Sequence, residues 1–442
     1  MQLLSSFYFQ RRFWMAALAL VALGLAGFPL PSLLFWSKAG FGLLTLLLLV
    51  DVLVLYRLPR GLEGERTLAD RLSNGDDNPV QLQFRNRYPF AISLTVIDEV
   101  PEQFQARHLQ FALQLAAGVQ KRHTYFLRPT KRGAYDFGFL NAYVASPLGL
   151  ASRRYKFALH KEVPVYPSYI QMHKFELLAF SSLPEQGIKR FRRMGQNQEF
   201  EQIRDYVQGD DYRTLNWKAT ARSGQMMVNT YQDERSQQVV SLIDKGRLMH
   251  MPFEGLSLLD WSINACLALS NIAIKKGDKA GLITFQEKIN LLLPPSRQGG
   301  QMNAILEALY KQKTAYKEAD FSRLYMGVRR QLPQRSLLLL FTNFESLQGM
   351  RRQLPQLRQL ARQHLLVVIF FENTELVQLL DAPVKGLEDV YTKTITQKLL
   401  HEKKLIVREL QQHGIQSLLT PPQGLTVSVI NKYLELKSRG LI

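Results

Sequence analysis

The sequence predicts a multi-domain chain: an N-terminal two-helix transmembrane hairpin, a β-sandwich-like domain, and a C-terminal α/β domain of the Rossmann-like kind. Three observations lead to this prediction. Two long apolar runs open the chain, short alternating segments follow them, and after residue 238 apolar strands alternate with helical patterns. We expect the hairpin over residues 1–60, the sandwich over 61–168, a linker over 169–237 and the α/β domain over 238–442.

The apolar runs cover residues 13–28, which carry no charge, and 39–56, which carry only Asp51. Extended into residues 29–36, the first run reaches about 20 residues, which suffices for a bilayer. A cleaved signal peptide is disfavoured because a second apolar run, and not a polar mature domain, follows it. We therefore expect a membrane hairpin, with Asp51 snorkelling to the interface.

Basic residues set the expected orientation of this hairpin. Arg11 and Arg12 precede the first run and several arginines follow the second, whereas Lys38 alone lies between the runs. The positive-inside rule then places both ends of the hairpin, and all that follows, in the cytoplasm. The single cysteine, Cys266, agrees with a reducing compartment, and it excludes an internal disulfide framework.

Composition limits the partners. The chain of 442 residues has 56 basic and 37 acidic residues, a formal net charge of +19. Such a charge favours a polyanionic partner, either nucleic acid or an anionic membrane face. The basic cluster at residues 189–193 contains one aromatic residue, Phe191, which is too few for a base-stacking platform. We therefore expect contact with membrane lipid and none with nucleic acid.

The segment from about residue 62 to 166 has the pattern of a β-sandwich. Residues 80–84 and 92–96 alternate apolar and polar side chains, and further short runs of this kind follow at 124–127, 134–137 and 155–159. Such spacing is typical of strands with one buried face. No cluster of catalytic side chains and no phosphate-binding loop interrupts them, so we expect a spacer or interaction module.

The last 200 residues have the pattern of a parallel α/β sheet. Apolar strands are expected at residues 239–243, 280–285, 337–341 and 365–371, with helices between them. Fully apolar strands indicate a sheet that is covered on both faces. Ligands of such sheets bind beyond the carboxyl ends of the strands. Because no glycine-rich dinucleotide motif and no Walker loop is present, a nucleotide fold is disfavoured.

The most informative stretch, residues 200–234, lies between these two regions. Arg204, Arg213 and Arg222 could each fork onto a carboxylate, and the candidates are Asp210, Asp211 and Glu234. Two interpretations are open: an ion-pair network that braces the chain, or a surface on which a partner docks. An enzyme site built on Asp210 and Asp211 is a weaker third, because no nucleophile or base is evident nearby.

The order of residues in this stretch is similar to a known sequence pattern. The matching positions are Arg204, Tyr206, Gly209, Asp210, Arg213, Trp217, Ala221 and Arg222. This order resembles the hallmark of the bacterial "domain of unknown function 58" proteins, and the turns at residues 131–133 and 146–150 are similar as well. The resemblance implies a von Willebrand factor type A fold for the α/β region. It also implies partnership with a MoxR-type AAA+ ATPase in the assembly or maturation of other proteins.

The resemblance further implies a place to look for a metal. Type A domains often bind Mg²⁺ through Asp-x-Ser-x-Ser after the first strand, with a Thr and an Asp from later loops. Here Asp244 is kept, but Gly246 and Leu248 replace the serines, and Asn343 stands where an Asp is expected. We expect neither a metal nor another cofactor at this degenerate site.

Positive charge beside the site supports this expectation. Lys245 and Arg247 interleave with the would-be ligands and could hold an acidic side chain of a partner directly. The sequence thus predicts an inner-membrane, cytoplasm-facing adaptor or scaffold for a AAA+ ATPase and a client protein, and no enzyme. A structural envelope organiser without an ATPase is the alternative, and a hydrolase using Asp210 and Asp211 is a weaker one.

Overall fold

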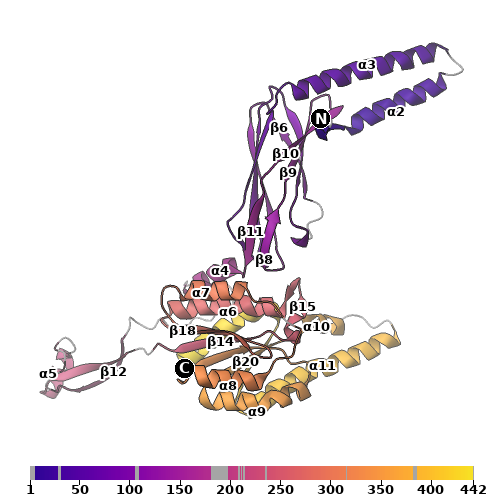
Figure 1. The fold of residues 1–442 in the computed structure, drawn as a ribbon. Helices are drawn as coiled ribbons and strands as arrows, with labels where there is room; N and C mark the ends of the chain where they lie inside the picture. Colours follow the sequence, from indigo (N-terminus) through magenta and orange to yellow (C-terminus); the bar gives the residue numbers. More distant parts are fainter. Residues whose placement is uncertain are drawn as a thin grey trace. The chain divides into compact units, whose positions relative to one another are not determined.

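A computed structural model describes the chain in ten stretches (Figure 1). These are residues 5–27, 31–104, 109–180, 198–207, 210, 212, 215–233, 236–314, 316–381 and 386–441. The chain divides into two compact units, Met1–Tyr166 and Pro167–Ile442. Each unit has its own apolar core.

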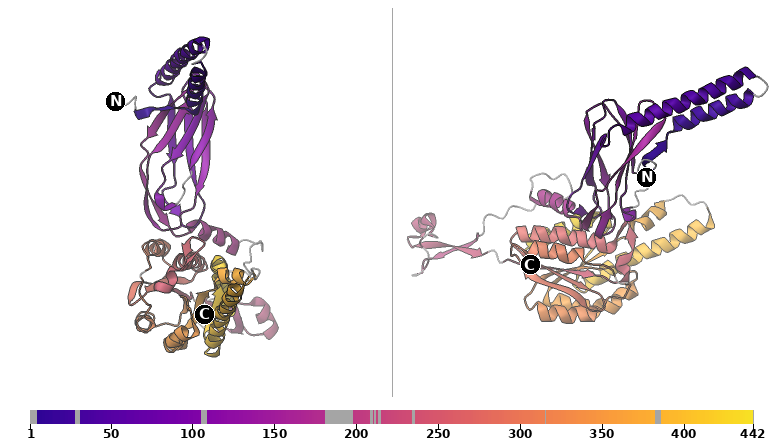
Figure 2. Two further views of the ribbon diagram at one scale, coloured as in Figure 1. Left: turned by 90° about the vertical axis from the view of Figure 1, so that its right-hand side faces the viewer. Right: turned by 45° about the horizontal axis from the view of Figure 1, so that its top comes forward.

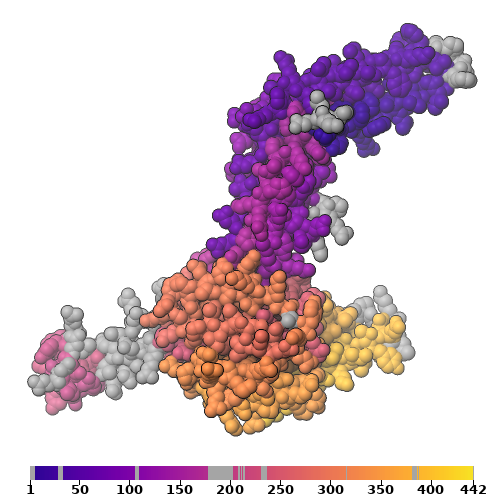
Figure 3. All heavy atoms as spheres, viewed as in Figure 1, coloured from indigo at the N-terminus to yellow at the C-terminus, as the bar shows by residue number. Residues whose placement is uncertain are grey.

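The first unit begins with two helices that pack side by side, α2 (Arg11–Ala26) and α3 (Pro31–Tyr56). Within the described residues one segment is long and apolar enough to cross a membrane, Leu33–Tyr56, with a mean hydropathy of 2.3. Its side chains are mostly uncovered, as the space-filling view of α2 and α3 makes plain (Figure 3). The unit therefore carries one apolar helix that fits a bilayer by length and composition.

The boundaries of α2 and α3 differ from those expected from the sequence. The 16 residues of α2 span about 24 Å, less than the roughly 30 Å of a bilayer core. The expected extension of the first helix into residues 29–36 is wrong, because residues 31–36 form the first turns of α3. Pro31 starts that helix, at a position where its missing N–H costs no hydrogen bond.

Asp51 joins α3 to the sandwich. Its carboxylate is 1% exposed and accepts hydrogen bonds from the Ser146 hydroxyl and from the backbone N–H groups of Leu150 (3.1 Å) and Ala151 (2.9 Å). The expectation that Asp51 snorkels to the membrane interface is therefore wrong. The carboxylate points into the protein, because the turn at residues 146–151 supplies donors that replace water.

The last turn of α3 is held by a second set of contacts. The Tyr88 hydroxyl donates to the carbonyl oxygen of Leu55 (2.7 Å), and the Arg153 guanidinium donates to those of Leu55, Leu58 and Pro59. These are carbonyl groups that a helix end leaves without partners. The carboxyl-terminal end of α3 is thus held firmly to the sandwich by hydrogen bonds.

The sandwich of the first unit has eleven strands among the described residues. They are β1 (Phe7–Phe9), β2 (Leu62–Thr67), β3 (Leu72–Ser73), β4 (Asn78–Asn86), β5 (Ile92–Asp98), β6 (Gln110–Leu115), β7 (Gln120–Leu127), β8 (Gly133–Phe137), β9 (Leu140–Ala145), β10 (Ala151–Phe157) and β11 (Lys161–Tyr166). They form sheets in the orders β1-β10-β9-β5-β6, β3-β11-β8 and β2-β4-β7. Alternate residues of β4 and β5 are buried, which is the period that a half-buried strand requires.

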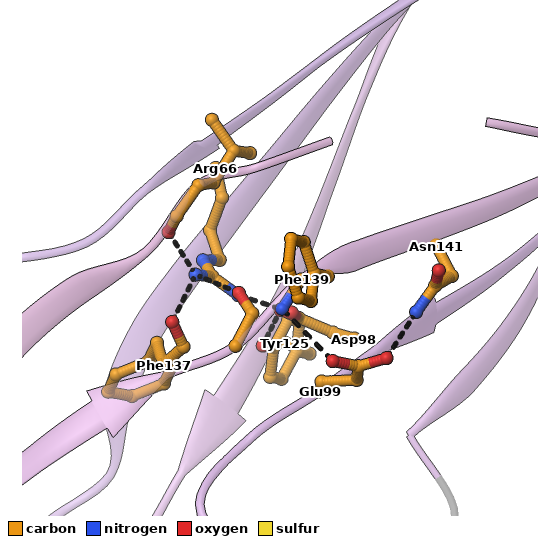
Figure 4. A network of polar contacts seen from close by, with 9 residues as sticks. Arg66, Asp98, Glu99, Tyr125, Phe137, Phe139 and Asn141 are labelled. Atoms are coloured by element: carbon orange, nitrogen blue, oxygen red, sulfur yellow. Dashed lines mark hydrogen bonds and ion pairs between the residues drawn. The ribbon is translucent and has the colours of Figure 1, made fainter. Parts of the chain in front are cut away.

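A buried ion pair crosses the core of this sandwich (Figure 4). The Arg66 guanidinium donates to Asp98 Oδ1 (2.5 Å) and to the carbonyl oxygens of Phe137, Gly138 and Leu159. Asp98 Oδ2 accepts the hydroxyl of Tyr125, whose pKa is raised mainly by burial and also by the Asp98 charge. The side chains of both charged partners are almost fully buried, so this pair is a satisfied internal brace.

The second unit contains the α/β sheet. Its helices are α4 (Tyr169–Phe180), α5 (Trp217–Ser223), α6 (Leu258–Lys275), α7 (Gln301–Tyr310), α8 (Phe321–Gln331), α9 (Leu347–Gln363), α10 (Thr374–Asp381), α11 (Leu387–Gln412) and α12 (Leu425–Ser438). Its strands are β12 (Gln198–Asp205), β13 (Met227–Asp233), β14 (Gln238–Asp244), β15 (Pro252–Phe253), β16 (Leu256–Ser257), β17 (Lys279–Phe285), β18 (Ile289–Ser296), β19 (Leu337–Phe341), β20 (Leu365–Phe371) and β21 (Gln416–Thr420). The six-stranded sheet has the order β18-β17-β14-β19-β20-β21 and is parallel except for β18 at its edge.

Helices cover both faces of this sheet (Figure 2). One apolar cluster joins the sheet to α6, α7 and α12, and a second joins its other face to α8, α9 and α11. Along β14, Val239 and Ile243 belong to the first cluster, while Val240 and Leu242 belong to the second. Strands that are buried on both faces need apolar side chains at nearly every position, as these have.

The segment that we expected to be a linker, residues 169–237, contains ordered elements. Helix α4 packs on α6: Met172 lies in the apolar cluster, and Glu176 accepts hydrogen bonds from Asn271 (2.7 Å) and Lys275. Farther on, β12 and β13 pair as an antiparallel ribbon that carries α5 between them. Residues 189–193, the basic cluster, lie outside the described residues.

Candidate functional site

The carboxyl edge of the α/β sheet brings several predicted site residues together. Strands β14 and β19 run parallel with Ile243 beside Phe341, so the residues that follow them meet at one edge. There the Thr342 hydroxyl donates to Asp244 Oδ2 (2.7 Å), and the backbone N–H of Gly246 donates to Asp244 Oδ1 (2.7 Å). Burial raises the pKa of Asp244 to about 6, although these two hydrogen bonds act in the opposite direction.

A lysine from a distant helix completes this edge. The Lys403 ammonium, in the middle of α11, donates to Asn343 Oδ1 (2.8 Å) and to the carbonyl oxygen of Phe344 (2.5 Å). Burial lowers the pKa of Lys403 to about 8, and the nearby charge of Glu345 opposes that shift. Sequence analysis missed Lys403, because 60 residues separate it from Asn343 and nothing in its local pattern marks it.

The donor set at this edge does not fit a divalent cation. The oxygen that Asn343 could offer already accepts the Lys403 ammonium, and Lys245 adds a second buried basic side chain. A serine at position 246 would be crowded, because a Cβ there would lie 3.0 Å from Asp244 Oδ1. Leu248, at the other serine position, lies in a 3-10 turn and brings no oxygen. The Lys403 ammonium occupies the Asn343 oxygen, and the turn at residues 246–248 supplies no hydroxyl group. Both features disfavour binding of a hard metal ion.

The two basic contact candidates differ in exposure. Lys245 is 8% exposed, so it offers little surface to a partner. Arg247 is at the surface, where its guanidinium pairs with Glu318 at 3.2 Å. Arg247 is therefore the better exposed of the two for contact with a partner; the backbone N–H of Lys245 donates to the carbonyl oxygen of Phe285, at the end of β17 (2.9 Å).

The signature stretch forms the β12–α5–β13 ribbon. The Arg204 guanidinium forks onto Asp210, with N–O distances of 2.9 and 2.7 Å, and Asp210 Oδ2 also accepts the backbone N–H of Val207 (3.0 Å). The hydrogen bonds from Arg204 and Val207 lower the pKa of Asp210. Asn216 caps α5 at the N–H of Ala219 and donates to the Asn229 side chain. These polar groups hold the turn in shape.

Large apolar side chains of the same ribbon remain uncovered. Trp217 is 70% exposed and Tyr212 71%, and the ring of Tyr212 stacks on Tyr206 with centroids 5.8 Å apart. Further exposed members are Ile203, Val207 and Met226. Ala221 and Arg222 are also exposed, on α5. Gly209, Asp211, Arg213 and Glu234 lie outside the described residues.

Comparison with known proteins supports one relationship. The model of the family described as "Protein of unknown function DUF58" matches residues 202–403. "Uncharacterized protein YeaD" of Bacillus subtilis (strain 168) is 26% identical over 270 residues, 59% of this chain and 64% of that protein, so the match spans less than two thirds of the relative's length.

Two solved structures are weakly similar to this chain. A "conserved hypothetical protein BatB" from Bacteroides thetaiotaomicron matches with a TM-score of 0.32 and 12% identity, over 46% of this chain and 100% of that one. An "uncharacterized membrane spanning protein" from Vibrio fischeri matches with a TM-score of 0.17 and 13% identity, over 46% and 99%. Likenesses this weak carry no argument about function.

The family match contains the ribbon, with its Arg204–Asp210 pair, and the polar edge as far as Lys403. Residues 202–403 of this chain are thus similar to the family described as "Protein of unknown function DUF58".

Proposed function

We propose that this protein is a membrane-anchored adaptor that presents its α/β unit, in the cytoplasm, to a MoxR-type AAA+ ATPase and a client protein. The anchor is α3, assisted by α2 as the other arm of a hairpin in a bacterial inner membrane. The apolar surface of α3 and the arginines at the sandwich-side ends of both helices support this orientation.

We also infer that the α/β unit is a von Willebrand factor type A domain. Five parallel strands covered by helices on both faces, with a polar site at their carboxyl edge, support this assignment. In this proposal the edge has exchanged its metal for an internal cation, Lys403. A partner that binds there meets a fixed polar surface, with no metal bridge to its own carboxylate.

The observation that carries the proposal is a division of roles within the signature ribbon. Its charged and amide side chains are used internally, as the Arg204–Asp210 pair and the Asn216 contacts are. Its large apolar side chains, Trp217 and Tyr212 above all, are left uncovered. Tryptophan and tyrosine are the residues most enriched among those that dominate binding energy at protein interfaces. The charges therefore brace the ribbon, and the aromatic residues dock the partner.

The two alternatives are less well supported. A hydrolase that uses Asp210 needs a carboxyl group free to exchange a proton or attack a substrate, whereas this carboxylate is locked by Arg204 and has a lowered pKa. A structural organiser without an ATPase would bind a different protein through the same ribbon. It differs from the adaptor only in the identity of the bound partner.

The test is to isolate the tagged full-length protein from its native membrane and to identify co-purifying proteins, with ATP present to stabilise an ATPase complex. We compare wild type with Trp217→Ala and with Met326→Ala. Met326, on α8, is 61% exposed and serves as the matched control for loss of an exposed apolar side chain. We expect a AAA+ ATPase with wild type and Met326→Ala, and at least about tenfold less with Trp217→Ala.

Equal recovery of the ATPase with all three proteins would contradict the docking role of the ribbon. Recovery of a different protein, lost only in Trp217→Ala, would favour the structural organiser. Any hydrolytic turnover that is abolished by Asp210→Asn would favour the enzyme.

A further inference from the structure

The end of the sandwich from which α3 leaves is strongly basic. Six exposed basic side chains gather there: Arg57, Arg60, Arg85, Arg87, Lys121 and Arg122. The acidic side chains of the same sheet end are Glu63, which pairs with Arg87, and Glu65. The balance of six basic against two acidic side chains makes this end positive in a unit whose sheets are otherwise mixed in charge.

Strand register brings these residues to one place. Leu62, at the start of β2, lies beside Asn86, at the end of β4, and the neighbouring Arg85 lies beside Gln120, at the start of β7. The backbone N–H of Arg87 donates to the carbonyl oxygen of Gly61 (2.9 Å). Since Arg57 directly follows the last residue of α3, this end of the sheet is also the end of the sandwich from which the apolar helix leaves (Figure 1).

An apolar loop stands at the same end. Residues 116–119, Ala-Ala-Gly-Val, are all exposed, and Val119 is 47% exposed. Asn86 fixes the loop: its side chain donates to the carbonyl oxygens of Leu115 and Ala116, and its backbone N–H donates to that of Val119 (3.1 Å). Gly118 takes a positive φ of 69° that the turn requires. A fixed apolar loop next to exposed lysine and arginine suits the interface of an anionic membrane.

We propose that this basic end, together with the 116–119 loop, binds the anionic phospholipid headgroups of the membrane that α3 crosses. The proposal rests on the membrane anchoring proposed above. Its occupant follows from continuity: the uncovered apolar part of α3 ends near Asp51, where the helix meets the sandwich, and Arg57 follows six residues, or about 9 Å of helix, farther on, within electrostatic reach of the headgroups. A shallow groove of about 270 Å³ lies beside Arg60 and is lined also by Tyr155, Phe157 and Glu63, whose carboxylate pairs with Arg87; it gives a headgroup phosphate a place next to the Arg60 guanidinium.

The consequence is a fixed height of the sandwich above the bilayer. Electrostatic attraction to headgroups fades within about 10 Å at physiological salt, so only side chains at this end contribute to it. Contacts at α3 through Asp51 and Arg153 already hold the helix against the sandwich. Headgroup binding adds a second attachment, which resists tilting of the unit about that helix.

The test uses the full-length chain in lipid nanodiscs with an environment-sensitive fluorophore on a single introduced cysteine. The native Cys266 is fully buried and leaves the new thiol to react alone. The label is placed by Val119→Cys or, as the control, by Phe126→Cys. Phe126 is 64% exposed on β7, the strand that follows the 116–119 loop, but lies beside Pro79, at the other end of β4.

We expect the label at position 119 to shift to the blue and brighten when phosphatidylglycerol replaces phosphatidylcholine, and the label at 126 to stay constant. High salt, or Lys121→Glu with Arg122→Glu, is expected to remove the response at 119. Incorporation into the disc reports the anchoring itself. An incorporated protein whose 119 label ignores the lipid, or responds no more than the 126 label, overturns headgroup binding and leaves the anchor standing. A chain that does not incorporate overturns both.

Discussion

Two arginine–aspartate pairs, one in each unit, are chemically alike and physically opposite. Arg66 and Asp98 meet inside the sandwich with side chains 1% and 0% exposed. Arg204 and Asp210 meet on the signature ribbon with side chains 41% and 21% exposed. Water solvates the second pair and cannot reach the first. Identical residue types therefore support a fold in one place and shape a surface turn in the other.

The comparison also shows what a surrounding hydrogen-bond network adds. Arg66 uses its remaining donors on carbonyl oxygens of two further segments, so it ties β2 to the end of β8 (Phe137 and Gly138) and to the connection between β10 and β11 (Leu159). Arg204 pairs with a residue only six positions along the chain, Asp210. A bond between distant segments constrains the whole domain, whereas a bond within a turn constrains that turn.

The largest expected effect is at the buried pair. Arg66→Ala leaves the buried Asp98 charge without a cation, which is expected to destabilise the sandwich by about 3–5 kcal/mol. The measurement is hydrogen exchange of the sandwich strands in the full-length protein, which separates this unit from the other. The double variant Arg66→Met with Asp98→Leu is expected to recover much of the loss. Equal damage in the single and double variants would contradict the ion-pair explanation.

Asp51 offers an intermediate case, a buried carboxylate held by one hydroxyl and two backbone N–H groups. Asp51→Ala removes the acceptor of one hydroxyl and two backbone N–H groups, at an expected cost of about 1–3 kcal/mol. We expect the amides of Leu150 and Ala151 to exchange faster. Asp70→Ala is the control, because that carboxylate is 98% exposed and pairs with Lys161 at the surface. Unchanged exchange at Leu150 and Ala151 would show that the contact does not secure α3.

Sequence analysis succeeded where the signal was local and failed where it was not. Residues 337–341 and 365–371 were predicted to the residue, because uninterrupted apolar runs mark strands buried on both faces. Strand β18 was missed, because Pro294 and Pro295 argue against a strand and are tolerated only at a sheet edge such as this one.

For the candidate site, too, contacts between residues close in sequence could be predicted and contacts between distant residues could not. Arg204 and Asp210 lie six residues apart, so their pairing could be named among the candidates from the sequence. Lys403 reaches Asn343 across 60 residues, and Arg66 reaches Asp98 across 32. Nothing local distinguishes these buried charges from solvated ones. Only the tertiary fold decides which charged residue of a basic chain is turned inward.

A smaller effect is expected at Glu176, which docks α4 on α6. Burial alone would raise the pKa of Glu176, but hydrogen bonds from Lys275 and Asn271 outweigh it and lower the pKa. A lowered folded-state pKa stabilises the docked helix above the unfolded pKa, and this stability is lost as the pH falls through the folded pKa. The thermal midpoint of wild type should therefore exceed that of Glu176→Gln at pH 7, and the difference should vanish in acid. A difference that does not change with pH would point to lost packing.

The smallest effect on stability is expected at the exposed pair, and it completes the comparison. Arg204→Ala should leave the thermal midpoint of the α/β unit unchanged within error, because water and salt replace the lost partner of Asp210. The pKa of Asp210 should rise toward its ordinary value once the Arg204 hydrogen bonds are gone, and carbon-detected NMR of the labelled carboxyl group measures this. Capture of the partner should weaken less than in Trp217→Ala, since Arg204 shapes the turn and does not face the partner. A loss of stability as large as that of Arg66→Ala would mean that the ribbon is part of the core of its unit, and the contrast between the two pairs would then be wrong.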